Sequence, residues 1–463
     1  MISPEKITDV LGTALRKGGD WADLFLEETL TNRAQLSDRS IKNIAQHQMA
    51  GAGLRVVSNL KEYYGYTNDL SEFGLLKIAR ELSDAVARNI QRKPIAIEKA
   101  FTPSLHPPKR LPQTITWNQK IGLLRQADEI GRGVSDKIVQ VNVDYMDEVQ
   151  RIFIANSDGV LKEDTRTRGR FSLSAVASDG EQKQVGYEAP GAQKGFEFFE
   201  SLDIPQMARE TGESAVRMLS ADYAPQGRMS VIIDSGFGGV IFHEACGHLL
   251  EASAVAKKAT VMAGKLGQDI AAPCVSAVDD GTLANEWGSL NIDDEGIPTR
   301  RNLLIENGIL KSYLVDRLNG ERIGLASTGS SRRQSYRFSP TSRMNNTYIL
   351  PGSDHLEDMI QTTDYGLYAK KMGGGSVNPA TGEFNFSVTE GYLIKNGKIV
   401  APIRGAVLIG RGEEILKKID RVGNNLKLAQ GMCGAASGWV PVNVGQPAIR
   451  VQDLLVGGQS PKR

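Results

Sequence analysis

The sequence of 463 residues is poor in cysteine and contains no long apolar run. Its three cysteines, Cys246, Cys274 and Cys433, cannot form a disulfide scaffold, and such a sparse set is typical of a reducing compartment. The N-terminal segment MISPEKITDVLGTALRKGGDW lacks the apolar core of a signal peptide, and no run of about 18 apolar residues occurs in the chain. We therefore expect a cytoplasmic protein with no membrane span.

The chain also lacks an excess of either charge. Lys and Arg number 55 and Asp and Glu number 54, which leaves a net charge of +1. This balance argues against a nucleic-acid-binding protein, because such proteins need a basic surface. Two glycine-rich stretches, at 51–53 and 236–239, do not complete a nucleotide-binding motif, and no G-x-S-x-G motif occurs. The sequence therefore gives no support to nucleotide binding or to a serine hydrolase.

What the sequence does contain is typical of a globular protein. Apolar residues make up 40% and charged residues 24% of the chain, and the 49 glycines follow no G-X-Y period, so we attribute them to tight turns. Residues 1–205 combine helical periodicity near 7–15 and 118–132 with short β-rich stretches at 22–29, 40–47, 53–57 and 63–66. We predict an α+β N-terminal domain with antiparallel strands, which includes a proline-rich connector at about 94–112.

Residues 206–463 have a different pattern. Strand-like segments alternate with glycine turns from about residue 270 onward, and the segment VIFHEACGHLLEASAVA at 240–256 has an apolar background that suits a buried helix. We predict a β-rich C-terminal domain that carries this one buried helix, and an α+β fold class for the whole chain.

The predicted buried helix contains the most informative motif, which runs from His243 through Glu244 to His248. The chain has only five histidines, and two of them lie here beside a glutamate. Two neutral imidazoles suit zinc, and a catalytic zinc site takes three protein ligands and a water. A carboxylate beside such a site can take a proton from the attacking water. One interpretation is therefore a metal hydrolase with Glu244 as general base.

The spacing of the two histidines does not fit a regular helix. Histidines at i and i+4 lie about 40° apart around a helix, whereas His243 and His248, at i and i+5, lie about 140° apart. Either the helix is distorted, as at a π-bulge, or the motif has another meaning; Gly247 is a weak helix former and makes a break plausible. In the alternative interpretation His243 is a buried core histidine, or it pairs with Cys246 and leaves His248 outside the site.

A third metal ligand must come from elsewhere in the chain. The other three histidines lie in ordinary polar segments, and Cys274 leads into an apolar, strand-like segment. Cys433 lies in Gly431-Met432-Cys433-Gly434, where the backbone can bend closely around a ligand. Taken alone, this context makes Cys433 a candidate and no more.

Together with several further motifs, these residues resemble the TldD/PmbA family of metalloproteases. The resemblance covers most of the chain and is strongest from about residue 228 onward. Its motifs are FHEACGH at 242–248, VDDGT at 278–282, GSLNIDDEG at 288–296, LIENGIL at 304–310, MGGGSVNPATGEF at 372–384, and GMCG with VPVNVGQPAIRVQDLLVGG at 431–458. The histidine spacing that does not fit a regular helix is this family's own HExxxH signature.

The resemblance implies a zinc ion bound by His243, His248 and Cys433, with Glu244 as the catalytic base. It also implies the TldD-type subunit, because the PmbA-type (TldE) partner lacks the HExxxH motif. Members of the family are cytoplasmic, act on peptides or unfolded proteins, and work as a heterodimer with an enclosed active site. We therefore expect a zinc-dependent metalloprotease that pairs with a PmbA/TldE-type subunit or forms a homodimer.

Two other functions remain open on the sequence alone. One is a non-catalytic assembly or regulatory subunit, in which His243 and His248 hold a structural metal or none. The other is a metal-dependent amidase that acts on small molecules. The acidic runs at 279–280 and 293–295 suit a second metal site or hydrogen-bonded turns, and for them we expect turns. The basic segment at 330–335 could bind a peptide carboxylate or backbone, or form a solvated loop, and we expect the loop.

Overall fold

The first part of the chain forms one long sheet. The computed structural model describes residues 3–86, 95–378 and 381–458. Within these ranges the sheet has eight strands in the order β3-β2-β1-β5-β6-β4, with β7 and β8 also paired to β6, and every pair except β4–β6 is antiparallel. The strands are β1 (Trp21–Ser37), β2 (Ser40–Ser58), β3 (Lys61–Thr67), β4 (Glu98–Lys99), β5 (Ile138–Asn156), β6 (Val160–Ser178), β7 (Lys183–Glu188) and β8 (Gly191–Ala192).

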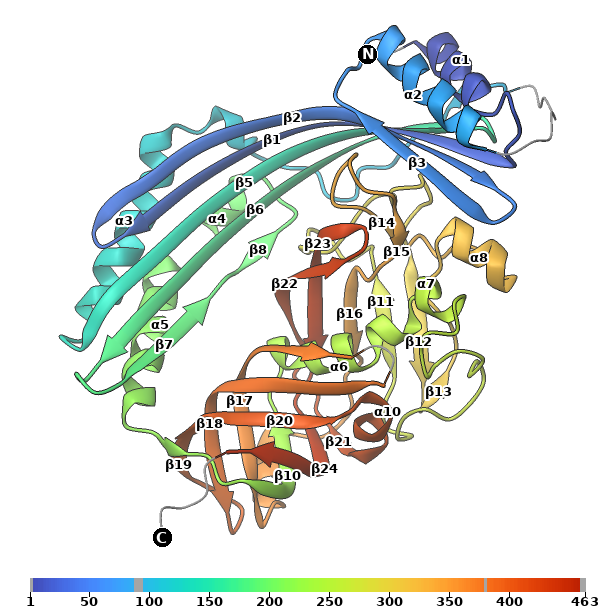
Figure 1. Ribbon diagram of the computed structural model, residues 1–463. Coiled ribbons are helices and arrows are strands. Elements are labelled where there is room, and N and C mark those ends of the chain that lie inside the picture. The colour runs from blue at the N-terminus through green and yellow to red at the C-terminus, as the bar shows by residue number, and fades with distance from the viewer. Residues whose placement is uncertain (1–2, 87–94, 379–380, 459–463) are drawn as a thin grey trace.

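Four strands of this sheet are much longer than predicted. β1 has 17 residues and β2, β5 and β6 have 19 each, and Figure 1 shows them as an arch over the rest of the molecule. The prediction of separate strands at 40–47 and 53–57 was wrong, because both segments belong to β2. The strand continues through Gly51, where a Cβ atom would lie 2.3 Å from the ring of Tyr336. This glycine therefore allows the segment around Tyr336 to lie against the sheet.

Helices cover the convex face of the arch. Alternate residues of β1, such as Leu24 and Ala34, point to this face and belong to the buried clusters that the helices complete. The helices lie in two groups, one toward each end of the arch (Figure 1): α1 (Pro4–Ala14) and α2 (Glu72–Ala85), and then α3 (Trp117–Gly133), α4 (Glu197–Glu200) and α5 (Ile204–Leu219).

The helices predicted near 7–15 and 118–132 are confirmed by α1 and α3. Ser3 caps α1 by accepting a hydrogen bond from the backbone N–H of Lys6. Thr116 and Gln119 form a capping box at the start of α3, in which each side chain accepts from the backbone N–H of the other residue. These local signals explain why the helix starts could be predicted from sequence.

The proline-rich connector forms almost no regular structure. Pro94 lies outside the described residues, and from 95 to 112 the structure has only the two-residue strand β4 and the first residue of the 3₁₀ turn η1 (Pro112–Thr114). The backbone N–H of Leu105 donates to Asn291 at 2.6 Å, and Nδ1 of His106 accepts from the backbone N–H of Asn285 at 2.9 Å. Polar contacts with the second half of the chain therefore hold this connector.

The second half of the chain forms two further sheets beneath the arch (Figure 1). Among the described residues one has the order β17-β10-β24-β20-β18-β19-β9, with β21 paired to β24, and the other has the order β13-β12-β11-β16-β23-β22. The strands of the first are β9 (Asp222–Tyr223), β10 (Gly227–Ile233), β17 (Tyr365–Val377), β18 (Glu383–Lys395), β19 (Lys398–Arg404), β20 (Ala406–Arg411), β21 (Ile419–Val422) and β24 (Ile449–Gly457). Those of the second are β11 (Ala277–Asp280), β12 (Arg301–Glu306), β13 (Ile309–Leu310), β16 (Asn346–Ile349), β22 (Lys427–Ala435) and β23 (Gly438–Gln446). A separate ribbon contains β14 (Ser331–Arg332) and β15 (Thr341–Ser342).

Helix α6 (Val240–Ala245) lies between these two sheets. Strand β10 leads through the 3₁₀ turn η2 (Gly236–Gly239) into α6, and Ile241 belongs to a buried cluster with residues of both sheets. A Cβ atom at Gly239 would lie 2.5 Å from the backbone of Gly445 in β23, so this glycine allows close packing. The remaining helical elements are η3 (Gly247–Leu250), α7 (Ala252–Val255), α8 (Arg317–Ile323), α9 (Leu356–Gln361), α10 (Gly412–Ile415) and η4 (Leu416–Lys418).

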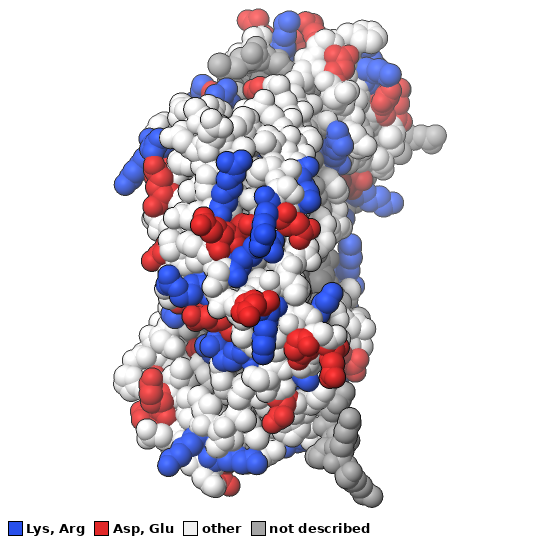
Figure 2. Space-filling view, turned by 90° about the vertical axis from the view of Figure 1, so that its left-hand side faces the viewer, with Lys and Arg blue, Asp and Glu red and all other residues white. Residues whose placement is uncertain are grey.

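The combination of helices with largely antiparallel sheets confirms the predicted α+β class. Among the described residues, no helix combines the length and the apolar composition that crossing a membrane requires. On the face shown in Figure 2, basic and acidic side chains are interspersed, and neither sign forms an extended area there. This face therefore reflects the even balance of charge in the sequence.

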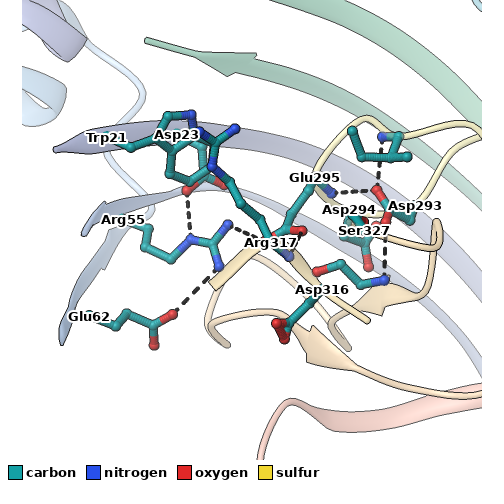
Figure 3. A network of polar contacts seen from close by, with 12 residues as sticks. Trp21, Asp23, Arg55, Glu62, Asp293, Asp294, Glu295, Asp316, Arg317 and Ser327 are labelled. Carbon is teal, nitrogen blue, oxygen red and sulfur yellow. Dashed lines mark hydrogen bonds and ion pairs between the residues drawn. The ribbon is translucent and has the colours of Figure 1, made fainter. Parts of the chain in front are cut away.

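A buried network of charged side chains joins the arch to the second half of the chain (Figure 3). Arg55 on β2 donates to Asp23 on β1 and to Glu295, both at 2.7 Å, and all three side chains are buried. The backbone N–H of Arg317 donates to the other oxygen of Glu295 at 2.9 Å. Removing one partner of such a buried pair typically costs about 3–5 kcal/mol, so this network fixes how the two parts of the chain meet.

The acidic run at 293–295 is hydrogen-bonded, as expected for a turn, whereas the expectation of a turn was wrong for Asp279 and Asp280, which lie in strand β11. Asp293 accepts from the backbone N–H groups of Glu295, Ile297 and Ser331 at distances of 2.9–3.1 Å. Asp279 likewise accepts from the backbone N–H of Asn345 at 2.7 Å. Backbone donors therefore use the oxygens that a second metal ion would need.

Glu390 on β18 ties helix α5 to the second-half sheet. It accepts from Ser214 of α5 at 2.7 Å, from Lys370 of β17 at 2.9 Å and from Tyr392 at 2.7 Å, and it is fully buried. Burial by itself would raise the pKa of Glu390, but the bonds from Lys370, Tyr392 and Ser214 outweigh it and lower the pKa to about 2. The ionised carboxylate is therefore the form that the fold stabilises.

We expect Glu390→Gln to destabilise the protein at neutral pH but not at low pH. The folded-state pKa lies below the ordinary value of 4.5, so the stabilisation is complete above about pH 4.5 and is lost as the pH falls toward 2. The expected loss is about 2–3 kcal/mol at pH 7, measured by denaturant unfolding across this range. Glu383→Gln, at an exposed position of the same strand, is the control. A Glu390→Gln defect of equal size at pH 3 and pH 7 would contradict this account.

Candidate metal centre

Three side chains from distant parts of the chain meet at one point. Nε2 of His243 and Nε2 of His248 each lie 3.3 Å from Sγ of Cys433. One ligand atom from each of these residues lies within 4.8 Å of the others, and the two imidazole rings are nearly perpendicular, at 85°. His243 and Cys433 are buried, and His248 is partly exposed. The structure thus brings together the three residues that the family resemblance implied as ligands.

A break in the helix allows the two histidines to face the same point. Helix α6 ends at Ala245, Cys246 has φ −132° and ψ −51°, and the chain continues as the 3₁₀ turn η3. Because of this break, His243 and His248 are not held at the angle of about 140° that a regular helix would impose. A Cβ atom at Gly247 would lie 2.1 Å from Sδ of Met344, so the glycine leaves room for the Met344 side chain where the chain turns. The predicted helix to residue 256 is therefore interrupted, by 3₁₀ structure and not by a π-bulge.

Cys433 reaches the site from β22, an edge strand of its sheet among the described residues. It pairs with Val440 of β23 and packs against Val440 and Val442. Its backbone carbonyl accepts from the fully buried Arg343, which also donates to Ser437 and to the Gly438 carbonyl at the end of the hairpin, both at 2.8 Å. The hairpin and this arginine therefore hold the thiol in place.

The geometry and chemistry of the three residues fit a zinc ion. Imidazole nitrogens and thiolate sulfurs both bind zinc, and a catalytic zinc site has three protein ligands with a fourth position open. With bonds of about 2.3 Å to sulfur and 2.0–2.1 Å to nitrogen, a tetrahedral angle places each nitrogen about 3.5–3.6 Å from the sulfur. The observed separation of 3.3 Å between each Nε2 and Sγ lies within about 0.3 Å of this value.

Charge at the site favours the form of cysteine that binds metals. Burial raises the pKa of the Cys433 thiol, but the imidazoles of His243 and His248 lower it by more, so that it lies well below the ordinary value. Burial lowers the pKa of His248, yet Glu251 and Cys433 outweigh this effect and raise it well above the ordinary value. The thiolate is the metal-binding form of cysteine, so the site is arranged to give up a proton to an arriving cation.

Glu244 lies at the edge of the same site. Its Oε2 atom is 3.8 Å from Nε2 of His248, and its side chain is 26% exposed. The carboxylate therefore lies beside the ligand atoms, where solvent can reach it. This is the position that a proton acceptor for an attacking water requires.

Two residues near the ligands were missed by the sequence analysis. Oε1 of the buried Glu251 lies 3.2 Å from Nδ1 of His248, the ring nitrogen that faces away from Cys433, and 3.9 Å from Nε of Arg343. Such a carboxylate orients a histidine ligand and fixes its tautomer. The position of Glu251 three residues after His248 was a usable signal, whereas no local pattern pointed to Arg343.

The other candidate residues lie outside this group. Cys246 is fully buried, and burial raises the pKa of its thiol to about 12. Cys274 is exposed. Among the remaining histidines, His106 accepts a backbone hydrogen bond, and His355 lies 3.3 Å from the side chain of Asn424. In the part of the chain that the structure describes, the one group of metal-ligand side chains of this kind contains His243, His248 and Cys433.

The chain matches three family models in succession. Residues 22–90 match the PmbA/TldA metallopeptidase domain 1, residues 110–219 match the central domain, and residues 226–458 match the C-terminal domain. Together these segments cover most of the chain. The resemblance seen in the sequence motifs also covers most of the chain.

Full-length relatives and a solved structure agree with this match. The chain is 36% identical to a "Metalloprotease TldD homolog" of Buchnera aphidicola subsp. Schizaphis graminum, over 95% of this chain and 93% of the relative. It is 34% identical to the protein of the same name from Haemophilus influenzae, over 99% and 97%. A "Zinc metalloprotease TldD homolog" of Saccharolobus solfataricus is 26% identical over 95% and 97%. The crystal structure of TldE from Thermococcus kodakarensis has the same fold, with a TM-score of 0.77 at 17% identity over 98% of this chain and all of that one. The chain therefore belongs to the PmbA/TldD family of metallopeptidases.

Proposed function

We propose that this chain is a zinc-dependent, cytoplasmic peptidase that hydrolyses peptide bonds in peptides or unfolded polypeptides. The observation that carries the proposal is the meeting of His243, His248 and Cys433 beside a partly exposed glutamate. These ligands come from two segments that are far apart in the sequence: His243 and Cys433 are separated by 190 residues. The name of the Saccharolobus relative, which includes zinc, supports the choice of metal.

In the proposed mechanism His243, His248 and Cys433 hold the zinc ion. When bound, the ion supplies a Lewis acid that polarises a carbonyl and makes water a nucleophile near neutral pH. Glu244 accepts a proton from the attacking water and passes it to the nitrogen of the departing amine. Glu251, 3.2 Å from Nδ1 of His248, keeps Nε2 of that ring directed toward the ligand position.

The rival function, a non-catalytic subunit with a structural metal, is less well supported. Structural zinc sites are closed by four protein ligands. The group found among the described residues contains three, which matches a catalytic site with one open position.

For the assembly, we propose pairing with a TldE-type subunit or with a second copy of this chain. The fold similarity to TldE supports a partner of the same architecture, because related chains commonly pair through equivalent surfaces.

Removal of the metal tests the proposed function. Protein treated with a chelator is expected to lose cleavage of an unfolded polypeptide, and one equivalent of zinc is expected to restore it without a change in secondary structure measured by circular dichroism. Small amides, assayed in parallel, separate a peptidase from an amidase. Full cleavage by the metal-free protein would refute the proposal. Zinc-loaded protein that cleaves no polypeptide, either alone or together with a TldE-type subunit, would also refute it.

A further inference from the structure

A cavity lined by arginines lies between the concave face of the arch and the β22–β23 hairpin. Its volume is about 770 Å³. Its walls are strands β1, β2, β5 and β6 of the arch, the segment at 332–338 and the hairpin, which rises toward the arch in Figure 1. We call it the arginine cavity, after Arg33, Arg166, Arg168, Arg332, Arg333 and Arg337.

The register of the arch strands places a polar row on this wall. Thr31 of β1 is paired with Glu148 of β5, and Glu148 is paired with Arg168 of β6. The neighbouring row contains Gln150 of β5 paired with Arg166 of β6. Because successive side chains in a strand alternate between faces, these residues share the face opposite to the helices. The concave face is therefore polar here, and the convex face is apolar.

Positive charge exceeds negative charge in the arginine cavity. Six arginines line it against three carboxylates, Glu27, Glu148 and Asp294. Each carboxylate already has partners: Glu27 accepts from the backbone N–H of Tyr336 at 2.7 Å, Asp294 from Arg166 at 2.8 Å, and Glu148 from Arg168 at 3.4 Å. Two buried acids behind the lining also form ion pairs, Asp164 with Arg166 and Asp23 with Arg333. Among the described residues, no ion pair involves the other three arginines of the lining, Arg33, Arg332 and Arg337.

Arg332 is the buried arginine of the cavity that forms no ion pair among the described residues. It is 2% exposed, and its side chain donates one hydrogen bond, to the carbonyl of Met344 at 2.6 Å. The pKa of Arg332 is lowered to about 9, mainly by burial and to a smaller extent by the positive charge of the nearby Arg168. Nε of the buried Arg168 also has no hydrogen-bond partner. The expectation of a solvated loop at 330–335 was therefore wrong, because within this segment only Gln334 is exposed and Arg332 is buried.

We propose that the arginine cavity binds a carboxylate group of the substrate polypeptide, away from the scissile bond. This inference rests on the proposed peptidase function and names the chemistry of its substrates. The planar guanidinium group offers paired donors that match the two oxygens of a carboxylate. A peptide substrate supplies the carboxylate either from its Asp and Glu side chains or from its C-terminus.

The position of the cavity suits a site that anchors substrate. Met432 and Cys433 are neighbours in β22; Met432 lines the arginine cavity, while Cys433 contacts the histidines. The cavity and the metal centre therefore lie on opposite faces of one hairpin. Met432 and Trp439 are 42% and 59% exposed, so the same hairpin also offers apolar surface to a bound chain.

Peptide binding to zinc-loaded, inactive Glu244→Gln protein tests this inference without any need for cleavage. Three labelled peptides of equal length are compared by fluorescence anisotropy: one with Asp and Glu and an amidated C-terminus, its Asn and Gln counterpart, and a neutral peptide with a free C-terminus. We expect the acidic peptide to bind at least about tenfold more tightly than its neutral counterpart. If the third peptide binds more tightly than the neutral peptide with an amidated C-terminus, the peptide's C-terminus is a second source of the carboxylate.

Matched variants connect the preference to the cavity. Arg332→Gln is expected to remove the preference for the acidic peptide. Arg337→Gln, at the exposed rim of the cavity, is expected to weaken this preference severalfold. Arg125→Gln, which removes the same charge from an exposed position of α3, is expected to leave it unchanged. If Arg332→Gln fails to fold, the Arg337→Gln result decides. The inference is overturned if all three peptides bind equally, or if the preference for a carboxylate survives in the folded Arg332→Gln and Arg337→Gln variants. A failed peptidase would appear instead as absent turnover in the parent protein.

Discussion

Replacing Cys433 with serine is expected to strip zinc from the protein and to abolish peptide cleavage. Sγ of Cys433 is the atom that both histidines contact, at 3.3 Å each, so its loss removes the centre of the ligand group. A serine hydroxyl is not ionised at neutral pH and is a poor substitute for a thiolate. Loss of residues that merely orient a ligand weakens metal binding about 10–100-fold, so we expect the loss of a direct ligand to exceed 100-fold.

Zinc content after dialysis, measured by elemental analysis, checks this prediction. Cys246→Ala is the matched control, because Cys246 lies between the two histidines in sequence but outside the ligand group. Its buried thiol has a pKa raised to about 12 by burial, so it is not available as a thiolate. We expect Cys246→Ala to keep one zinc per chain. A Cys433→Ser protein that retains its zinc, or a folded Cys246→Ala protein that loses it, would show that the ligands were wrongly assigned.

Replacing Glu244 with glutamine is expected to separate metal binding from catalysis. The side chain lies beside His248 but is not one of the three grouped ligands, so zinc content should stay at one per chain. An amide cannot accept the proton of the attacking water, and loss of a general base typically costs about 10²–10⁴-fold in rate. We therefore expect kcat to fall by that factor.

Single-turnover cleavage of a labelled unfolded polypeptide, with zinc measured in the same samples, provides the test. Glu244→Asp keeps a carboxylate with a shorter reach and is expected to retain more activity than the glutamine variant. Wild-type turnover by Glu244→Gln would remove Glu244 from the mechanism, whereas loss of zinc from that variant would make it a ligand instead.

Local signals in the sequence were sufficient for helices α1 and α3 but not for the length of the strands. The capping box of Thr116 and Gln119 marks the start of α3, and such motifs depend only on neighbouring residues. Strand β2 was divided in the prediction between residues 47 and 53, where Gly51 indicates a turn. Pairing with β1 along its whole length keeps it extended, and that pairing is not visible in a single sequence.

The metal centre was only partly accessible to sequence reasoning. The spacing of His243 and His248 required a broken helix, and the break is present after Ala245. The kind of break depends on the fit of Gly247 against Met344, which is a tertiary contact. Cys433 could be proposed from the residues alone only as a candidate, because its approach depends on β22 lying beside β23. The family resemblance supplied the connection that local patterns lacked.

The arginine cavity illustrates a site with no sequence signature. Arg166 and Arg168 come from β6, and Arg332 comes from a segment more than 160 residues later in the printed sequence. Each looks like a surface residue when taken alone. Strand register and the packing of the 332–338 segment against the arch place them around one cavity.

X-ray absorption at the zinc edge, on protein carrying one zinc per chain, tests the central claim most directly. The account predicts one sulfur ligand at about 2.3 Å and two imidazole nitrogens at about 2.0–2.1 Å, with a further light atom in the open position. A spectrum without sulfur, or with two or more sulfur ligands, would contradict a centre built from His243, His248 and Cys433.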